Sequence, residues 1–299
     1  MYPNQHSLGY ETISTGQTIA FVPQHQALQP GMEFQMRPKP VFDNPDYNGS
    51  NKLRNKIILI TGADSGIGRA AAVAFAKEGA NLAIVYLNEK QDALETKAYI
   101  ENLNQKCILL EGDITNPEFC SQAVKETIDA YNHIDILVNN AAVQFPQNSI
   151  SDISEAQLEL TFKTNIFSMF YMTKSALPYL DEWSSIINTT SVTAYQGEKT
   201  LIDYSATKGA IVSFTRSLAE NLSARNIRVN AIAPGPVWTP LIVSSFSAER
   251  VRTFGTDVPM KRAAQPFEVA PSFVYLACDD SRYVTGQVLH VNGGIPVES

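Results

Sequence analysis

The chain has 299 residues, a formal net charge of −7, 44% hydrophobic residues and 18% charged residues. This composition is ordinary for a globular chain, and the acidic balance argues against a nucleic-acid-binding surface. No apolar run has membrane-spanning length and no signal-like start is present, so we expect a cytoplasmic protein without a membrane partner. The three cysteines and four histidines lack the spacing of metal ligands, so we expect reduced thiols and no metal site.

Residues 1–51 differ in composition from the rest of the chain. Pro and Gln recur between Pro23 and Pro40 and no apolar period persists, which predicts an irregular N-terminal extension. The stretch also carries Phe34, Met36 and Phe42, which a fully solvated tail does not need. We therefore expect the extension either to be partly disordered or to place its second half on the folded body or on a neighbouring subunit. Residues 52–299 are expected to form one domain.

A strand, a glycine-rich turn and a helix are predicted between residues 56 and 78. Residues 56–61 are apolar and β-branched, as in a strand buried on both faces, and residues 69–78 are Ala-rich and helical. Glycines between them let the backbone approach a pyrophosphate, whose charge the helix N-terminus favours. The spacing T-G-x-x-x-G-x-G differs from the usual three-glycine fingerprint, and a turn without a ligand is the alternative. We expect a dinucleotide to be bound by Gly62, Asp64, Ser65, Gly66, Ile67 and Gly68.

Strands and helices alternate through the rest of the chain. This order predicts an α/β fold with a single Rossmann-type, doubly wound parallel sheet and helices on both faces. Further strands are expected at 81–87, 107–111, 134–139, 185–190, 227–233 and 287–291, and helices at 91–103, 116–130, 154–180 and 209–222. Ligands of such sheets lie at the carboxyl ends of the strands. The residues expected to converge there are Gly62, Asp113, Asn139, Ser191 and Pro234.

Tyr204 and Lys208 are four residues apart in a segment that continues as a helix. Such residues lie on one helix face, so the ammonium can lie close to the phenol. A phenol has a reference pKa of about 10, and a nearby cation lowers it. The pair would therefore serve as an acid–base device, although the same spacing also occurs on ordinary exposed helices.

Taken together, these motifs resemble the short-chain dehydrogenase/reductase family over residues 52–294. The extension and the glycine-loop sequence resemble a bacterial branch that contains general-stress oxidoreductases and an NADP-dependent aldehyde reductase. The matching elements are Thr61–Gly68, Asn139–Ala142, Ser191, Tyr204-x-x-x-Lys208 and Pro234-Gly235. The resemblance implies an oxidoreductase that interconverts an alcohol and an aldehyde or ketone.

The resemblance also implies roles for four catalytic residues. Tyr204 would exchange a proton with the substrate oxygen, which Ser191 would hold, and Lys208 would bind the cofactor ribose and lower the pKa of Tyr204. Asn165 would anchor a water that links Lys208 to solvent. For Ser191 a strand-end cap is the alternative role, and for Asn165 a local structural bond.

The cofactor is expected to be NAD or NADP. The segment 85–89 lacks the usual Asp for NAD, but it also lacks the Arg or Lys that a 2′-phosphate needs, and Asp64 would repel that phosphate. These residues favour NAD, whereas the resemblance to an aldehyde reductase favours NADP. Beyond the glycine loop, cofactor contacts are expected from Asp113, Ile114, Asn139, Ala141, Tyr204, Lys208, Pro234, Gly235, Val237 and Thr239.

Other functions and the assembly are also addressed by the sequence. A sugar or polyol dehydrogenase and a 3-oxoacyl reductase are alternatives within the family, and a non-catalytic dinucleotide-binding sensor is an alternative outside it. The substrate is expected to contact residues 192–201 and a mobile lid at 241–258.

Apolar side chains in the segment 162–172 go most of the way round the helix, so the helix face turned away from the sheet needs a partner that buries it. We expect a homotetramer, with a dimer as the alternative.

Overall fold

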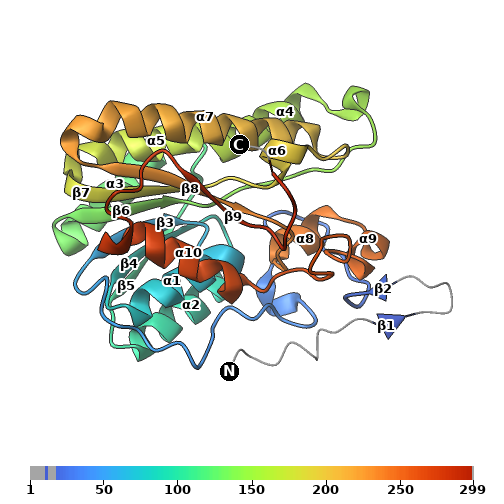
Figure 1. The fold of residues 1–299 in the computed structure, drawn as a ribbon, viewed down its shortest axis with the longest axis horizontal. Helices are drawn as coiled ribbons and strands as arrows, with labels where there is room; N and C mark the ends of the chain where they lie inside the picture. Colours follow the sequence, from blue (N-terminus) through green and yellow to red (C-terminus); the bar gives the residue numbers. More distant parts are fainter. Residues whose placement is uncertain (1–10, 13–17, 298–299) are drawn as a thin grey trace.

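The computed structural model describes residues 11–12 and 18–297 and is built on a seven-stranded parallel sheet (Figure 1). The strand order is β5-β4-β3-β6-β7-β8-β9, and every neighbouring pair is parallel. The strands are β3 (Ile57–Thr61), β4 (Asn81–Tyr86), β5 (Cys107–Glu111), β6 (Ile134–Asn139), β7 (Leu180–Thr189), β8 (Arg228–Pro234) and β9 (Val288–Val291). Strand β3 is buried along its whole length, as its apolar sequence predicts.

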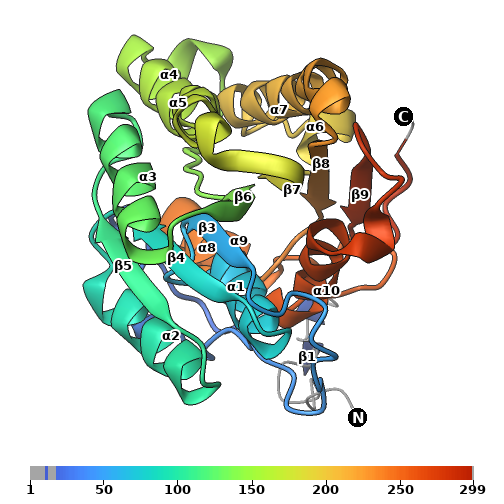
Figure 2. The same cartoon turned by 90° about the vertical axis from the view of Figure 1, so that its left-hand side faces the viewer.

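Helices cover both faces of the sheet (Figure 2), which confirms the predicted doubly wound α/β fold. One face carries α1 (Gly66–Lys77), α2 (Lys90–Asn102) and α10 (Pro266–Ala277). The other carries α3 (Pro117–Tyr131), α5 (Ser168–Ala176) and α7 (Ile202–Leu222). Each helix layer buries its own apolar cluster against the sheet, so the strand ends are fixed on both sides.

The predicted helix 154–180 is wrong as a single element. It consists of α4 (Glu155–Phe162), a π-helical turn η4 (Lys163–Phe167), α5 and a short 3-10 turn η5 (Leu177–Tyr179). Pro178 stands in that last turn, where it ends the helix, and β7 begins at Leu180. Strand β7 therefore starts five residues before the predicted position 185, and the chain reaches the sheet directly from the helix end.

Several helices begin or lie where the sequence did not predict them. Helix α1 begins at Gly66, inside the glycine loop, and not at Arg69. Helix α10 was missed because Pro266 and Pro271 suggest a loop, whereas Pro266 occupies the first turn, where its missing N–H costs nothing. The segment expected to be a mobile lid contains α8 (Pro240–Ser245) and α9 (Ala248–Arg252), and α6 (Thr193–Gln196) follows β7.

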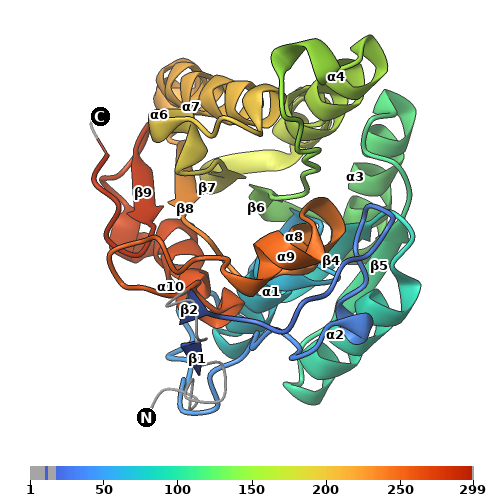
Figure 3. The ribbon, with the colours of Figure 1, turned by 90° about the vertical axis from the view of Figure 1, so that its right-hand side faces the viewer.

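The described part of the extension from residue 20 onward lies on the folded body (Figure 3). It follows two short strands, β1 (Glu11–Thr12) and β2 (Thr18–Ile19), and includes the 3-10 turn η2 (Glu33–Gln35). The Phe21 ring stacks on the Trp238 ring at 3.7 Å between centroids, and the Trp238 Nε1–H donates to the Pro38 carbonyl at 3.0 Å. The predicted disorder at residues 1–10 and 13–17 concerns positions outside the described residues.

Over the described ranges, no helix combines the length and the hydropathy needed to cross a membrane.

Candidate active site

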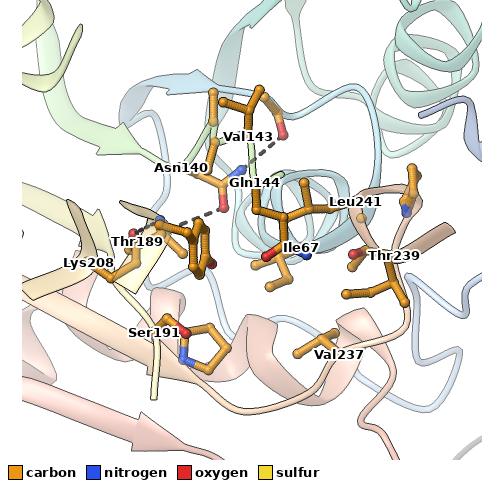
Figure 4. Close-up of a pocket in the computed structure, with 18 of the residues that line it drawn as sticks. Ile67, Asn140, Val143, Gln144, Thr189, Ser191, Lys208, Val237, Thr239 and Leu241 are labelled. Atoms are coloured by element: carbon orange, nitrogen blue, oxygen red, sulfur yellow. Dashed lines mark hydrogen bonds between the residues drawn. The ribbon is translucent and has the colours of Figure 1, made fainter. Parts of the chain in front are cut away.

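A cavity of about 660 Å³ opens at the carboxyl ends of the strands (Figure 4). Its size is typical of sites for small molecules and cofactors. Most of the residues predicted from the sequence line it. They are Gly62, Asp64, Ser65, Gly66, Ile67, Gly68, Asp113, Ile114, Ala141, Ser191, Tyr204, Lys208, Pro234, Gly235, Val237 and Thr239. Residues from opposite ends of the sequence therefore share one chamber, as the parallel topology requires.

The glycine loop leaves bare backbone at the floor of this cavity. Gly62 has φ +65°, and a Cβ there would lie 2.9 Å from the Ala141 Cα. A Cβ at Gly68 would lie 2.0 Å from the Gly62 carbonyl oxygen, so neither position accepts a side chain. Ser65 precedes the first helical residue of α1. The loop thus has the form that holds a dinucleotide pyrophosphate: backbone exposed to the cavity at a helix N-terminus.

A buried ion network behind the loop was not predicted from the sequence. The Glu33 carboxylate, from the extension, accepts from the Gly66 N–H at 2.7 Å and from the Arg69 guanidinium at 2.7 Å. Arg69 also donates to the Asp64 and Asp92 carbonyl oxygens at 2.8 and 2.6 Å. Glu33 and Arg69 are nearly inaccessible to solvent. The only signal in the sequence is an Arg placed directly after the glycines in an otherwise apolar helix, and it does not identify the partner.

Two carboxyl groups stand at the end of the cavity beside β4. Asp64 and Glu89 both line it and both are buried. Burial and the neighbouring Glu89 carboxylate raise the pKa of Asp64 to about 8. Glu89 accepts from the Leu87 and Asn88 N–H groups, whereas Asp64 Oδ2 has no partner among the described residues. This free oxygen is placed to accept a hydrogen bond from a ligand hydroxyl.

Ser191, Tyr204 and Lys208 lie together in the wall of the cavity. Ser191 follows β7, and Tyr204 and Lys208 lie one turn apart in α7. The Ser191 hydroxyl lies beside the Tyr204 phenol, where it favours the phenolate, and the Lys208 Nζ lies 5.3 Å from the Tyr204 ring centroid. Lys208 Nζ donates to the Thr189 carbonyl at 2.9 Å, which fixes the ammonium beside the phenol.

The expected lowering of the Tyr204 pKa by Lys208 is not found in this structure. Burial raises the pKa of Tyr204 to about 12, and the Ser191 hydrogen bond acts in the opposite direction. Burial also lowers the pKa of Lys208 to about 7, so the lysine does not carry a full charge at neutral pH. Desolvation therefore dominates the pKa of Tyr204, and the phenol is a proton donor across the neutral range.

Asn165 lies in the π-helical turn η4 and does not line the cavity. Its side-chain amide accepts from the Val143 N–H at 2.8 Å and donates to the Val143 carbonyl at 2.9 Å and to Thr207 Oγ1 at 3.2 Å. It therefore joins the loop after β6 to α7, which is the local structural role considered as the alternative. The water-anchoring role stays a prediction.

The side chain of Asn139 does not reach the cavity either. This side chain is buried, and its Nδ2 donates to Asn188 Oδ1 of the neighbouring strand β7 at 2.9 Å. Its neighbour Asn140 lines the cavity instead and donates to the Thr61 and Gly62 carbonyl oxygens at 3.2 and 3.0 Å. Successive side chains of a strand point to opposite faces of the sheet, which explains why Asn140 faces the cavity and Asn139 does not. Any adenosine contact of Asn139 would have to involve its backbone.

The other half of the cavity is bounded by the segments expected to select the substrate. Apolar side chains from both segments line it: Val192, Leu201, Leu241, Ile242, Phe246, Phe254 and Val258. The segment expected to be mobile is held by the extension, since the Ala20 and Gln26 N–H groups donate to the Arg252 and Val243 carbonyls at 2.6 and 2.8 Å. Trp238 is buried against Phe21 and does not face the cavity.

Comparison with known proteins places this geometry in context. A family model described as enoyl-(acyl carrier protein) reductase matches residues 62–296. General stress protein 39 of Bacillus subtilis is 55% identical over 91% of this chain and 95% of its own length. The chloroplastic NADPH-dependent aldehyde reductase 1 of Arabidopsis thaliana is 52% identical over 92% of this chain and 98% of its own. Both halves of the resemblance drawn from the sequence, the stress-protein branch and the aldehyde reductase, are confirmed.

Solved structures share the fold. The crystal structure of a short-chain glucose/ribitol dehydrogenase from Brucella melitensis has a TM-score of 0.74 to this chain, with 32% sequence identity. The similarity covers 83% of this chain and 99% of that one.

Proposed function

Because the chain belongs to the short-chain dehydrogenase/reductase family and is an NAD(P)-dependent oxidoreductase, we propose that it interconverts an alcohol and an aldehyde or ketone. The observation that carries this proposal is the grouping of Ser191, Tyr204 and the buried Lys208 in the same cavity as the glycine loop. The glycine loop fits a dinucleotide, which would lie on Gly62–Gly68. When bound, its nicotinamide supplies or accepts the hydride.

The side chains of the chain itself handle the proton. In the reducing direction Tyr204 donates its phenolic proton to the oxygen of the carbonyl group, which the Ser191 hydroxyl holds by a hydrogen bond. The pKa of Tyr204, about 12, keeps the phenol protonated for this step. Lys208 is placed to stabilise the phenolate that remains, because it gains charge most readily when a negative oxygen forms beside it.

Three other functions are alternatives to a reductase that accepts many aldehydes and ketones. The carrot and rice relatives named glucose and ribitol dehydrogenases favour a sugar or polyol. A 3-oxoacyl reductase is supported by the name of one solved structure from Brucella melitensis. A non-catalytic sensor is disfavoured because Ser191, Tyr204 and Lys208 are all retained in one wall. A screen of aldehydes, ketones, sugars and acyl thioesters against NADH and NADPH separates these functions by kcat/KM.

We propose NAD as the preferred cofactor. Strand β4 ends at the part of a dinucleotide fold that reads the adenosine ribose. Here that part presents the carboxyl groups of Asp64 and Glu89, and the unpaired Asp64 Oδ2 is placed to form a hydrogen bond with a ribose hydroxyl. Among the described lining residues the cations are Lys208, which belongs to the catalytic group, and Arg250, which belongs to α9. The Arabidopsis relative is named for NADPH, so the preference has to be measured.

Leu87→Arg is expected to raise kcat/KM for NADPH relative to NADH by about tenfold, because the new guanidinium can pair with a 2′-phosphate. Leu87 lines the cavity and is 42% exposed, so the longer side chain has room. Leu94→Arg is the matched control, because Leu94 is an exposed residue of α2 that does not line the cavity. A wild-type protein that already prefers NADPH strongly would contradict the NAD proposal.

We also propose a homotetramer, with a dimer formed by the α4, α5 and α7 layer as its building block. Phe167 and Phe170 are 42% and 52% exposed, and the Phe170 ring lies 4.5 Å from the Phe214 ring of α7. A Cβ at Gly209 would meet nothing within 4 Å, so the outer face of α7 is open there. Such an apolar surface is typical of an isologous interface. The edge strand β9 is the second surface proposed for the tetramer.

Phe170→Asp is expected to break the wild-type oligomer into smaller species, because a charge in a buried apolar interface has no partner. Multi-angle light scattering at micromolar concentration measures the mass. Leu94→Asp places the same charge on the exposed face of α2 and should leave the mass unchanged. A wild-type protein that is monomeric and active would contradict this assembly.

A further inference from the structure

The side-chain amide of Gln144 is an unused donor in the wall of the cavity. Gln144 is 3% exposed and lines the cavity together with Val143, as Figure 4 shows. Its Nε2 is buried and has no hydrogen-bond partner among the described residues. A buried donor without a partner is costly, and in natural structures such donors are usually bonded by a ligand or a water. Gln144 lies in the loop after β6 and is not required for the hydride or proton steps described above.

The N-terminal extension holds the backbone of this residue from both sides. The Gln144 N–H donates to Gln29 Oε1 at 3.2 Å, and Gln29 Nε2 donates to the Gln144 carbonyl. The Ser245 hydroxyl, from α8, donates to the same carbonyl at 3.3 Å. Gln29 therefore acts on the position of Gln144, while the Gln144 amide group stays free.

The extension itself forms part of the cavity wall at this place. Gln29, Pro30 and Gly31 all line the cavity. The fit against α8 is close, because a Cβ at Gly31 would lie 2.6 Å from the Pro240 carbonyl oxygen. The position of Gln144 is thus fixed by a segment that lies before the residues matched by the family model.

A second polar atom in the same cavity is also unpaired. Thr193 begins α6, two residues after Ser191, and its Oγ1 is buried without a partner among the described residues. The rest of this half of the cavity is lined by the apolar side chains named above and by Gln196, Glu198, Arg250 and Asp257. Two unpaired polar atoms in such a surrounding indicate a ligand that carries oxygen atoms besides the one that reacts.

We propose that the Gln144 side-chain amide, positioned by Gln29, donates a hydrogen bond to a hydroxyl oxygen of the substrate. The substrate class is then the hydroxylated aldehydes and ketones, with polyols as the corresponding alcohols, in preference to plain alkyl aldehydes. The Thr193 hydroxyl supplies a second contact to the same oxygen-rich chain. This inference rests on the proposed carbonyl reduction and narrows its substrate.

The test compares D-glyceraldehyde with propanal, which has the same carbon chain without the hydroxyl groups. The wild-type ratio of kcat/KM for the two aldehydes should favour glyceraldehyde by about tenfold or more. Gln144→Leu, and the isosteric Gln144→Met as a second variant, should lower this ratio about tenfold. Gln91→Leu is the matched control, because Gln91 is exposed on α2, does not line the cavity, and donates its amide to the Glu95 carboxylate at 3.4 Å. It should keep the wild-type ratio.

Gln29→Leu tests the contribution of the extension. If Gln29 acts by positioning Gln144, its removal lowers the same ratio, and Gln29→Leu adds little in a Gln144→Leu background. A purely structural role would lower kcat/KM for both aldehydes equally and leave the ratio unchanged. Activity with an unaltered ratio in both Gln144 variants would overturn this inference alone. Failure of the wild-type protein to reduce any carbonyl would overturn the proposed function and the inference with it.

Discussion

Tyr204→Phe is expected to lower kcat by about 10²–10⁴-fold, because it removes the proton donor and changes little else. The phenylalanine ring should take the position of the tyrosine ring, because residue 204 belongs to α7 and Tyr204 is only 8% exposed. The lost atom is the phenolic oxygen, which lies beside the Ser191 hydroxyl. Dinucleotide affinity should stay within a few-fold of wild type, because the substitution does not alter the glycine loop. Steady-state kinetics and a fluorescence titration with NADH measure the two quantities.

The pH dependence of the wild-type protein supplies a second readout of the same residue. With a pKa of about 12, the Tyr204 phenol is protonated throughout the neutral range. Carbonyl reduction, which needs the phenol, should not lose activity through Tyr204 deprotonation between about pH 6 and 9. Alcohol oxidation needs the phenolate and should rise with pH across that range. A Tyr204→Phe protein with wild-type turnover would refute the assignment, and a matched Tyr179→Phe variant at an exposed tyrosine should behave as wild type.

The sheet and the position of the site were predictable because both depend on local patterns. Strand β3 is a continuous apolar run followed at once by glycines, so its burial and the turn after it follow from sequence. The same holds for Ser191 after β7 and for the i, i+4 pair in α7. Parallel topology then brings these strand ends together, whatever the loops between them do.

The features that escaped prediction depend on contacts between distant segments. Nothing near Glu33 in the sequence indicates that its carboxylate caps α1, since its partners Gly66 and Arg69 lie more than thirty residues away. The link between Gln29 and Gln144 spans 115 residues. The pKa values of Tyr204 and Lys208 depend on distant segments in the same way, because the burial that raises one and lowers the other follows from tertiary packing.

Arg69→Leu is expected to lower the free energy of unfolding by about 3–5 kcal/mol, because it leaves buried carboxylates without their cation. Glu33 and Asp92 are 1% and 0% exposed, and both accept backbone N–H groups that hold them in place. Lys52→Met is the control. It breaks the ion pair between Lys52 and Asp280, whose side chains are 42% and 52% exposed, and should cost far less than Arg69→Leu. Urea denaturation followed by circular dichroism gives both values.

The loss of unfolding free energy in Arg69→Leu should depend on pH, and the substitution should also loosen the extension. Burial already raises the pKa values of Glu33 and Asp92, and removing Arg69 raises them further. A carboxyl group with a raised pKa in the folded state stabilises the fold at low pH and loses that contribution as pH rises, so the deficit should shrink from pH 8 to pH 5. Release of the extension would uncover Trp238, and its fluorescence in a Trp183→Phe background should shift to the red. If Arg69→Leu costs no more than Lys52→Met and leaves this emission unchanged, the ion network does not hold the extension on the body.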